Sequence, residues 1–153
     1  MAVYNSALGN ILIEHTNSCL TRLMISHAEP LSSQSKDNFT DMVFAQITDY
    51  ITGSRREFNL NYSLVNLTPF QQKVYKELTQ IPYSKTITYK QLAQKIGSPK
   101  ASRAVGSACK KNPLHLIIPC HRVIASSGQL SGYAGGEDTK EFLLNLESSL
   151  SPQ

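Results

Sequence analysis

The sequence has few cysteines, no tryptophan and no long apolar run, and these shortages exclude several classes of protein. Its three cysteines, Cys19, Cys109 and Cys120, lie far apart and form no CxxC pair, which argues against a disulfide framework and a zinc knuckle. No apolar run approaches the ~20 residues that a membrane-spanning helix needs, and no basic-then-apolar leader opens the chain. We therefore expect a soluble protein with no membrane partner, from a reducing intracellular compartment: cytoplasmic, or nuclear in a eukaryote.

Charge is distributed unevenly along the 153 residues. Residues 1–67 carry four basic and six acidic side chains, a net charge of −2. Residues 68–122 carry ten basic side chains and one acidic side chain, a net charge of +9. Residues 123–153 carry one basic and four acidic side chains, a net charge of −3. A basic stretch is often only a solvated face. Nine net positive charges between two acidic flanks instead favour a polyanion, such as nucleic acid, as partner.

The first half of the chain has the pattern of a small α/β lobe. Apolar and polar residues alternate over 9–16 and 19–27, as in half-buried antiparallel strands. Apolar positions recur at helical spacing from Phe39 to Ile51, which predicts a helix. Residues 58–67 are expected to be extended and to link this lobe to a second one.

The second half is predicted to be mostly helical. The segment 68–78 opens with Thr-Pro, a cap followed by a favoured first helical residue. A helix over 88–96, the turn 97–99 and a second helix from about Lys100 form the pattern of a helix-turn-helix. A closing helix is predicted over 137–147, with acidic residues in its first turn. The chain is thus expected to be an α+β protein with domains at 1–67 and 68–153.

Cys120 has an unusual setting for a core cysteine. It follows Pro119 and precedes His121 and Arg122 in the string LIIPCHRVI. A free thiol, with a pKa near ~8.5, is only slightly ionised at neutral pH, and an imidazole that takes the proton directly or through one water removes that limit. Glu147 is a candidate to orient the imidazole. Spacing alone leaves Cys–His chemistry and plain packing equally open.

The string PCHRV, with RAVG before it and GYAGG after it, resembles the active-site region of the O6-alkylguanine-DNA alkyltransferases. The likeness covers nearly all of residues 68–147. It implies a small N-terminal lobe like ribonuclease H and a helical lobe with a winged helix-turn-helix. We expect the protein to act as a monomer without a cofactor. The implied reaction is direct-reversal repair of double-stranded DNA. An alkyl group moves irreversibly from O6-alkylguanine to the protein, once per molecule; activity on O4-alkylthymine is left open.

The resemblance also implies roles for individual residues. Cys120 is the alkyl acceptor, His121 the water-linked base and Glu147 the group that orients His121. Tyr89 hydrogen-bonds the guanine ring, and Asn112 braces the turn that holds the active site. Tyr89 could instead simply cap and pack a helix, and Glu147, near the end of the chain, could be solvated.

By the same resemblance, Arg103 fills the stack that a flipped-out nucleotide vacates, although most surface arginines merely face solvent. The other DNA-binding positions lie on the helix-turn-helix: Tyr89, Lys90, Lys95, Lys100, Ala101, Ser102, Gly106 and Lys110. The resemblance also implies that residues on both sides of Cys120 form the wall of the alkyl pocket: His115, Pro119, Ser131, Tyr133 and Ala134.

Departures from the family pattern leave some questions open. His115 stands where relatives commonly have proline, so the tolerance of bulky alkyl groups is undetermined. Some relatives bind zinc in the first lobe, but His15, Cys19 and His27 lack a fourth ligand, and we expect no metal. Two alternatives remain: a DNA-lesion-binding module without transfer activity, against which Cys120 argues, and a cysteine hydrolase, which would turn over.

Overall fold

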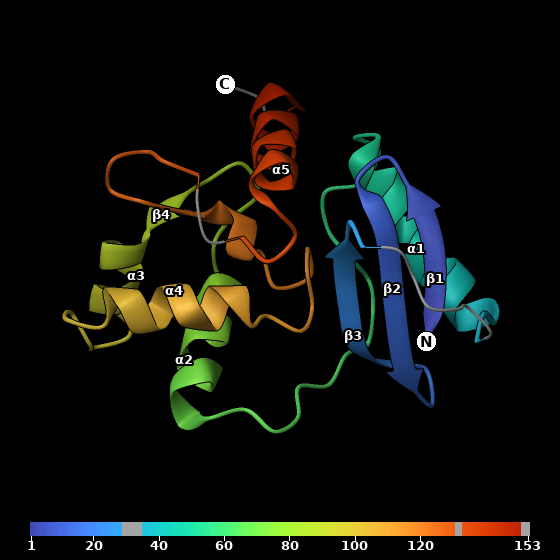
Figure 1. Cartoon of the computed structure of the whole chain (residues 1–153), viewed down its shortest axis with the longest axis horizontal. Coiled ribbons are helices and arrows are strands. Elements are labelled where there is room, and N and C mark those ends of the chain that lie inside the picture. The colour runs from blue at the N-terminus through green and yellow to red at the C-terminus, as the bar shows by residue number, and fades with distance from the viewer. Residues whose placement is uncertain (29–34, 131–132, 151–153) are drawn as a thin grey trace. The chain divides into compact units, whose positions relative to one another are not determined.

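The computed structural model describes residues 1–28, 35–130 and 133–150. The chain divides into two compact units, Met1–Val65 and Asn66–Gln153, each with its own elements (Figure 1). Among the described residues, no helix has both the length and the apolar character needed to cross a membrane.

The first unit is a three-stranded antiparallel sheet with one helix. The strands β1 (Ala2–Ser6), β2 (Gly9–Thr16) and β3 (Cys19–Ser26) lie in the order β1-β2-β3, and α1 (Asn38–Ile51) packs against β1 and β2. The sequence pattern predicted β2, β3 and α1 but missed β1. Its first three residues, Ala2 to Tyr4, are all buried, so the strand lacks the alternation by which half-buried strands are recognised.

Local sequence explains where α1 begins. The Asp37 carboxylate accepts a hydrogen bond from the Thr40 backbone N–H at 2.8 Å, and the Thr40 hydroxyl accepts one from the Asp37 N–H at 2.9 Å. This reciprocal cap satisfies backbone donors that a helix start leaves unpaired, and such a cap contributes about 1 kcal/mol. Val43, Ile47 and Tyr50 then form the buried face of the helix.

The second unit is mostly helical, as predicted. Its helices are α2 (Pro69–Leu78), α3 (Tyr89–Lys95), α4 (Ser102–Lys110), the 3-10 turn η1 (Cys120–Arg122) and α5 (Glu137–Leu150). Two short strands that the sequence pattern missed, β4 (Ile87–Thr88) and β5 (Val123–Ile124), pair in parallel. At two residues each they are too short for a recognisable period. Their pairing holds the chain that follows η1 beside the start of α3.

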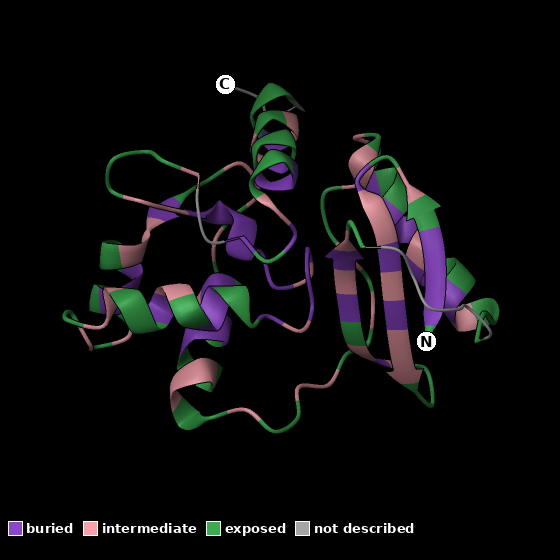
Figure 2. Cartoon of the chain, viewed as in Figure 1, coloured by how far each residue is buried: buried purple, intermediate pink, exposed green. Residues whose placement is uncertain are grey.

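The helix-turn-helix consists of α3 and α4, which lie against each other. Capping boxes at Thr68 and Thr88 start α2 and α3 where the sequence predicted. Helix α4 starts two residues later than the predicted Lys100, because the Ala101 N–H donates to the Ser98 carbonyl at 2.9 Å and closes a turn across Pro99 and Lys100. Figure 2 shows buried residues on the inner sides of α2 and α4 and throughout η1.

Candidate active site

Cys120 begins η1 immediately after a tight turn. Its backbone N–H donates to the Ile118 carbonyl at 2.7 Å, across Pro119 at φ −79° and ψ 62°. These angles and this hydrogen bond define an inverse γ-turn. The proline ring restricts φ to nearly this value before folding, so the local sequence itself favours the turn that presents the cysteine.

A second tight turn lies just upstream, around Leu116. The Ile117 N–H donates to the His115 carbonyl at 2.9 Å, and Leu116 between them has a φ of +72°. A non-glycine residue in this region stores about 1–3 kcal/mol of backbone strain. Leu116 and Ile118 are both buried, and packing of this kind holds the strained segment in place.

Asn112 joins the end of α4 to the nucleophile. Its side-chain Nδ2 donates to Cys120 Sγ at 3.1 Å and to the Ile118 carbonyl at 2.9 Å, while its Oδ1 accepts from the Leu114 N–H at 2.9 Å. Asn112 is itself buried. A hydrogen bond donated to the sulfur favours the thiolate over the thiol.

Burial makes the Cys120 thiol hard to ionise without help. Only 1% of the residue is exposed, and burial raises its pKa to about 11, although the Asn112 hydrogen bond and the Lys140 charge act in the opposite direction. The thiol is therefore protonated at neutral pH in the free protein. A nearby base must accept the proton before the sulfur can act as a nucleophile.

His121 has the properties of such a base. It is fully buried, and its Nε2 lies 2.6 Å from Glu147 Oε2. Because a carboxylate only accepts hydrogen bonds, Nε2 carries the proton and Nδ1 carries the lone pair. Nδ1 has no hydrogen-bond partner among the described residues. Burial lowers the pKa of His121 despite the neighbouring carboxylate, which keeps the ring neutral and able to accept a proton.

Glu147, on α5, is buried and charged rather than solvated. Burial alone would raise its pKa, but hydrogen bonds from His121 and Arg122 outweigh that effect and hold the pKa well below its usual range. Arg122 donates through Nε at 2.8 Å and Nη2 at 3.1 Å, and the Ser84 N–H donates at 3.1 Å. Arg122, which lies within PCHRV, was not among the predicted site residues.

Tyr89 and Lys140 contact each other through their polar groups. Tyr89 is the first residue of α3, and burial raises the pKa of its hydroxyl. The Lys140 ammonium donates to that hydroxyl at 3.5 Å and to the Val123 carbonyl. Lys140 was not anticipated. One signal was available: it is the only basic residue in the acidic segment 123–153.

Three of the five predicted pocket residues are buried near Cys120. The Tyr133 ring lies 5.7 Å from the His115 ring and 6.3 Å from the His121 ring, measured between centroids. Pro119 adjoins Cys120 and is buried. Ala134 is exposed instead, and Ser131 lies outside the described residues.

Comparison with known proteins gives both halves of the chain the same assignment. Residues 69–149 match the DNA binding domain of 6-O-methylguanine DNA methyltransferase, and residues 1–64 match its ribonuclease-like domain. This chain belongs to the 6-O-methylguanine DNA methyltransferase family. The two-lobe α+β plan predicted from the sequence is thereby confirmed.

Individual members of the family resemble the chain over nearly its whole length. It is 39% identical over 153 residues to the methylated-DNA–protein-cysteine methyltransferase of Methanosarcina acetivorans, with 97% of each chain covered. It is 40% identical over 149 residues to the constitutive enzyme of Bacillus subtilis, covering 92% of this chain and 90% of the other. The crystal structure of Mycobacterium tuberculosis OGT in complex with DNA matches with a TM-score of 0.82 and 39% identity, covering 99% and 94%.

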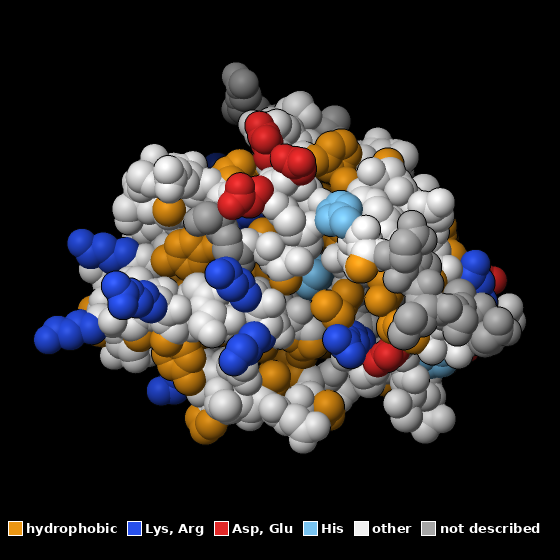
Figure 3. Space-filling view, in the orientation of Figure 1, with side chains coloured by type: hydrophobic (Ala, Val, Ile, Leu, Met, Phe, Trp, Pro, Cys, Tyr) orange, Lys and Arg blue, Asp and Glu red, His pale blue; other side chains and the backbone are white. Residues whose placement is uncertain are grey.

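The basic residues of the DNA binding domain lie on its surface. Of the ten between 68 and 122, nine are exposed and only Arg122 is buried. Figure 3 shows Lys and Arg side chains over α3 and α4, among other places, while acidic side chains gather over α5. Arg103 and Lys110 lie on the exposed face of α4, whereas Ala101, Ser102 and Gly106 are partly buried. A Cβ at Gly106 would lie 3.9 Å from the Tyr89 ring, so α4 runs close to Tyr89.

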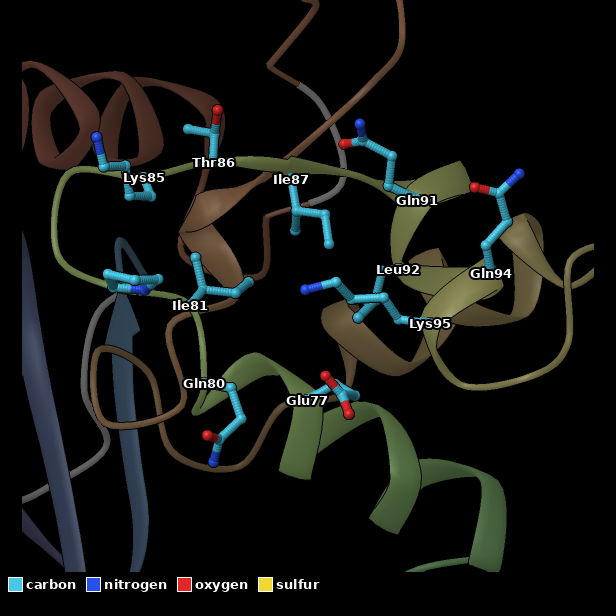
Figure 4. Close-up of a pocket in the computed structure, with 11 residues that line it drawn as sticks. Glu77, Gln80, Ile81, Lys85, Thr86, Ile87, Gln91, Leu92, Gln94 and Lys95 are labelled. Atoms are coloured by element: carbon cyan, nitrogen blue, oxygen red, sulfur yellow. The ribbon is translucent and has the colours of Figure 1, made fainter.

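A separate cavity of about 550 Å³ lies between the end of α2, the following loop and α3. In Figure 4 the side chains of Ile81, Ile87, Leu92 and Lys95 converge on its centre. Lys95 is the one predicted DNA-binding residue in its lining, and none of the residues around Cys120 takes part. The cavity is therefore distinct from the candidate active site.

The histidines and cysteine of the first unit do not form a cluster. His15 Nε2 lies 2.7 Å from Asp37 Oδ2, next to the start of α1, while His27 is exposed and Cys19 partly exposed. Across the described ranges, no three side chains of His, Cys, Asp or Glu come together in a way that would hold a metal ion.

Proposed function

We propose that this protein repairs DNA by moving the alkyl group of O6-alkylguanine irreversibly to its own Cys120, once per molecule. Its family membership supports the general function, which is methyl transfer from methylated DNA to a protein cysteine. This transfer reverses the damage directly. The observation that supports Cys120 as acceptor is the hydrogen bond from the Asn112 amide to its sulfur, together with the His121–Glu147 pair that begins at the next residue of the chain.

The proton moves before the alkyl group does. The Cys120 thiol passes its proton to Nδ1 of His121 through one water, and the imidazolium that forms is stabilised by the Glu147 carboxylate 2.6 Å away. The thiolate then attacks the alkyl carbon. A carbon–sulfur bond forms, the bond from carbon to guanine O6 breaks, and its electron pair goes to the base. Tyr89 donates a proton to a ring nitrogen, so guanine leaves neutral. The thioether product has no easy hydrolysis, which explains a single turnover.

The buried thiol requires the damaged base to leave the duplex. With Cys120 only 1% exposed, a stacked base cannot reach it, and flipping the nucleotide out is the general solution. Arg103, exposed on α4, is proposed to fill the vacated stack, and the surrounding lysines to bind phosphates.

One copy of the chain suffices for the reaction, because the proposed catalytic residues all lie between Tyr89 and Glu147 of one chain. We therefore propose a monomer.

The mass of the intact protein after mixing with duplex containing O6-methylguanine tests this proposal. We expect a gain of one CH2 group that stops at one equivalent and maps to Cys120. Cys120→Ser should gain nothing, while the control Cys109→Ser should react like the unmodified chain. Binding without a mass gain would indicate a lesion-binding module. Continued turnover would indicate a hydrolase, and either result would overturn the proposal.

A further inference from the structure

Lys140 is a fully buried lysine in the first turn of α5. Placing an ammonium away from water is costly, and long cationic side chains are seldom fully buried unless they are paired. A neutral side chain of similar length, such as methionine, would fill the same space without that cost. The position therefore calls for an explanation beyond packing.

The contacts of Lys140 link segments that are far apart in the sequence. Its ammonium donates to the carbonyl of Val123, in β5 directly after η1, and to the hydroxyl of Tyr89, in α3, at 3.5 Å. It also lies 5.6 Å from the centroid of the Tyr89 ring. One cation thus connects the segment that carries the proposed nucleophile with the proposed proton donor.

We propose that Lys140 is a positioning residue for alkyl transfer, one that fixes the Tyr89 hydroxyl and supplies positive charge for the anions formed during the reaction. This inference rests on the proposed function. When Tyr89 gives its proton to the leaving guanine, a phenolate forms, and the N–H of Lys140 that already points at this oxygen stabilises it until solvent returns the proton. Before that step, the same charge stabilises the Cys120 thiolate, which becomes a neutral thioether on attack.

The electrostatics of the site agree with this assignment. Among the described residues, Cys109, Cys120 and Glu137 act on the ionisation of Lys140, and the Lys140 charge acts on Cys120 and His121. Tyr89 contacts the ammonium through its hydroxyl. The Lys140 charge lowers the pKa of Cys120 against the larger, opposite effect of burial. Burial lowers the pKa of Lys140 itself, while the two cysteines and Glu137 act to raise it.

Two reagents separate the two effects of Lys140. Iodoacetamide alkylates a thiolate without needing a proton donor, whereas free O6-alkylguanine needs both the thiolate and Tyr89, and neither requires DNA binding. We expect Lys140→Met to shift the pH midpoint of the iodoacetamide reaction upward by about one unit, a roughly tenfold loss of rate at neutral pH. The loss with O6-alkylguanine should be larger. Lys140→Arg, which keeps the charge, should restore the midpoint. Lys76→Met, at an exposed position, is the matched control.

The outcomes show whether Lys140 acts in the reaction or only contributes to the stability of the fold. If folded Lys140→Met kept the midpoint with both reagents, the proposal would be overturned. The same holds if Lys140→Met lost no more activity with O6-alkylguanine in the wild-type background than in a Tyr89→Phe background. Should Lys140→Met not fold, the 15N shift of Lys140 Nζ in the unmodified protein provides the test: an amine already neutral at pH 7 overturns the proposal, and a charged one supports it. Failure of the proposed function is distinguishable, because the unmodified protein would then gain no alkyl group from O6-alkylguanine while still reacting with iodoacetamide.

Discussion

The side-chain amide of Asn112 donates hydrogen bonds both to Cys120 Sγ, 3.1 Å away, and to the Ile118 carbonyl, 2.9 Å away. One buried residue therefore stabilises the γ-turn before the nucleophile and the negative charge that the nucleophile must acquire. Asn112 therefore contributes both to the reactivity of Cys120 and to the stability of the turn that precedes it.

Replacing Asn112 with alanine should reduce both properties. A hydrogen bond to a charged group contributes about 1.5–3 kcal/mol, so the rate of alkyl transfer should fall by roughly 10–100-fold. The free energy of unfolding should fall by about 1–3 kcal/mol, since the Ile118 carbonyl loses a partner. Single-turnover kinetics and denaturant titration measure the two effects. Asn145→Ala, at an exposed position of α5, should change neither; an unaltered rate in Asn112→Ala would contradict the role of Asn112 at the sulfur.

Acid should destabilise the protein through Glu147 and His121. The pKa of Glu147 is lowered on folding from its ordinary 4.5, so its contribution is present above that pH and is lost as pH falls below it. The pKa of His121 is lowered from 6.5, so folding favours its neutral form, and stability also falls as pH drops below 6.5. Both effects have the same sign. Thermal unfolding should therefore show Tm decreasing from pH 7 to pH 3.

The variant Glu147→Gln shows how much of this acid sensitivity is due to the Glu147 carboxylate. It should unfold more easily at pH 7, by up to about 3–5 kcal/mol, because Arg122 remains buried without its counter-charge. Below pH 4.5 its Tm should fall less steeply than that of the unmodified chain. Glu141→Gln, exposed on the same helix, serves as control. Equal steepness in all three proteins would mean that folding does not lower the pKa of Glu147.

Binding to undamaged duplex DNA should weaken steeply with salt and depend little on base sequence. Phosphate contacts release counterions, and each contact contributes roughly 0.9 to the slope of log K against log salt concentration. Changing the exposed Lys90, Lys95, Lys100 and Lys110 together to glutamine should reduce that slope. Changing Lys36, Lys73 and Lys76, three lysines exposed outside the helix-turn-helix, should have a smaller effect for each lysine changed. Fluorescence anisotropy at several salt concentrations measures the slopes, and an unchanged slope in the first variant would show that another surface binds the phosphates.

Arg103 should matter for base flipping and not for the transfer itself. Flipping costs a few kcal/mol of lost stacking and pairing, part of which an inserted side chain offsets. Arg103→Ala should therefore slow repair of alkylated duplex strongly while hardly changing the reaction with free O6-alkylguanine. Tyr89→Phe should impair both reactions, because Tyr89 acts on the base. Equal losses with both substrates in folded Arg103→Ala would assign Arg103 a structural role.

The sequence by itself determined what depends on near neighbours. The caps at Thr68 and Thr88 and the turn at Gly97–Pro99 involve residues only a few positions apart, so α2 and α3 were predicted with their starts. The same holds for the juxtaposition of Pro119, Cys120 and His121. Where a local rule was incomplete, as at the start of α4, the prediction missed by two residues.

Only the tertiary structure decided which distant groups share the buried site. Glu147 lies 26 residues from His121, and Lys140 lies 51 residues from Tyr89; no periodicity or capping rule connects such pairs. Burial then changed their chemistry: it raises the pKa of Cys120 and lowers those of His121 and Lys140. The type of a side chain and its neighbours in the sequence do not reveal how much of its solvent exposure is lost on folding, because that loss depends on every segment packed around it.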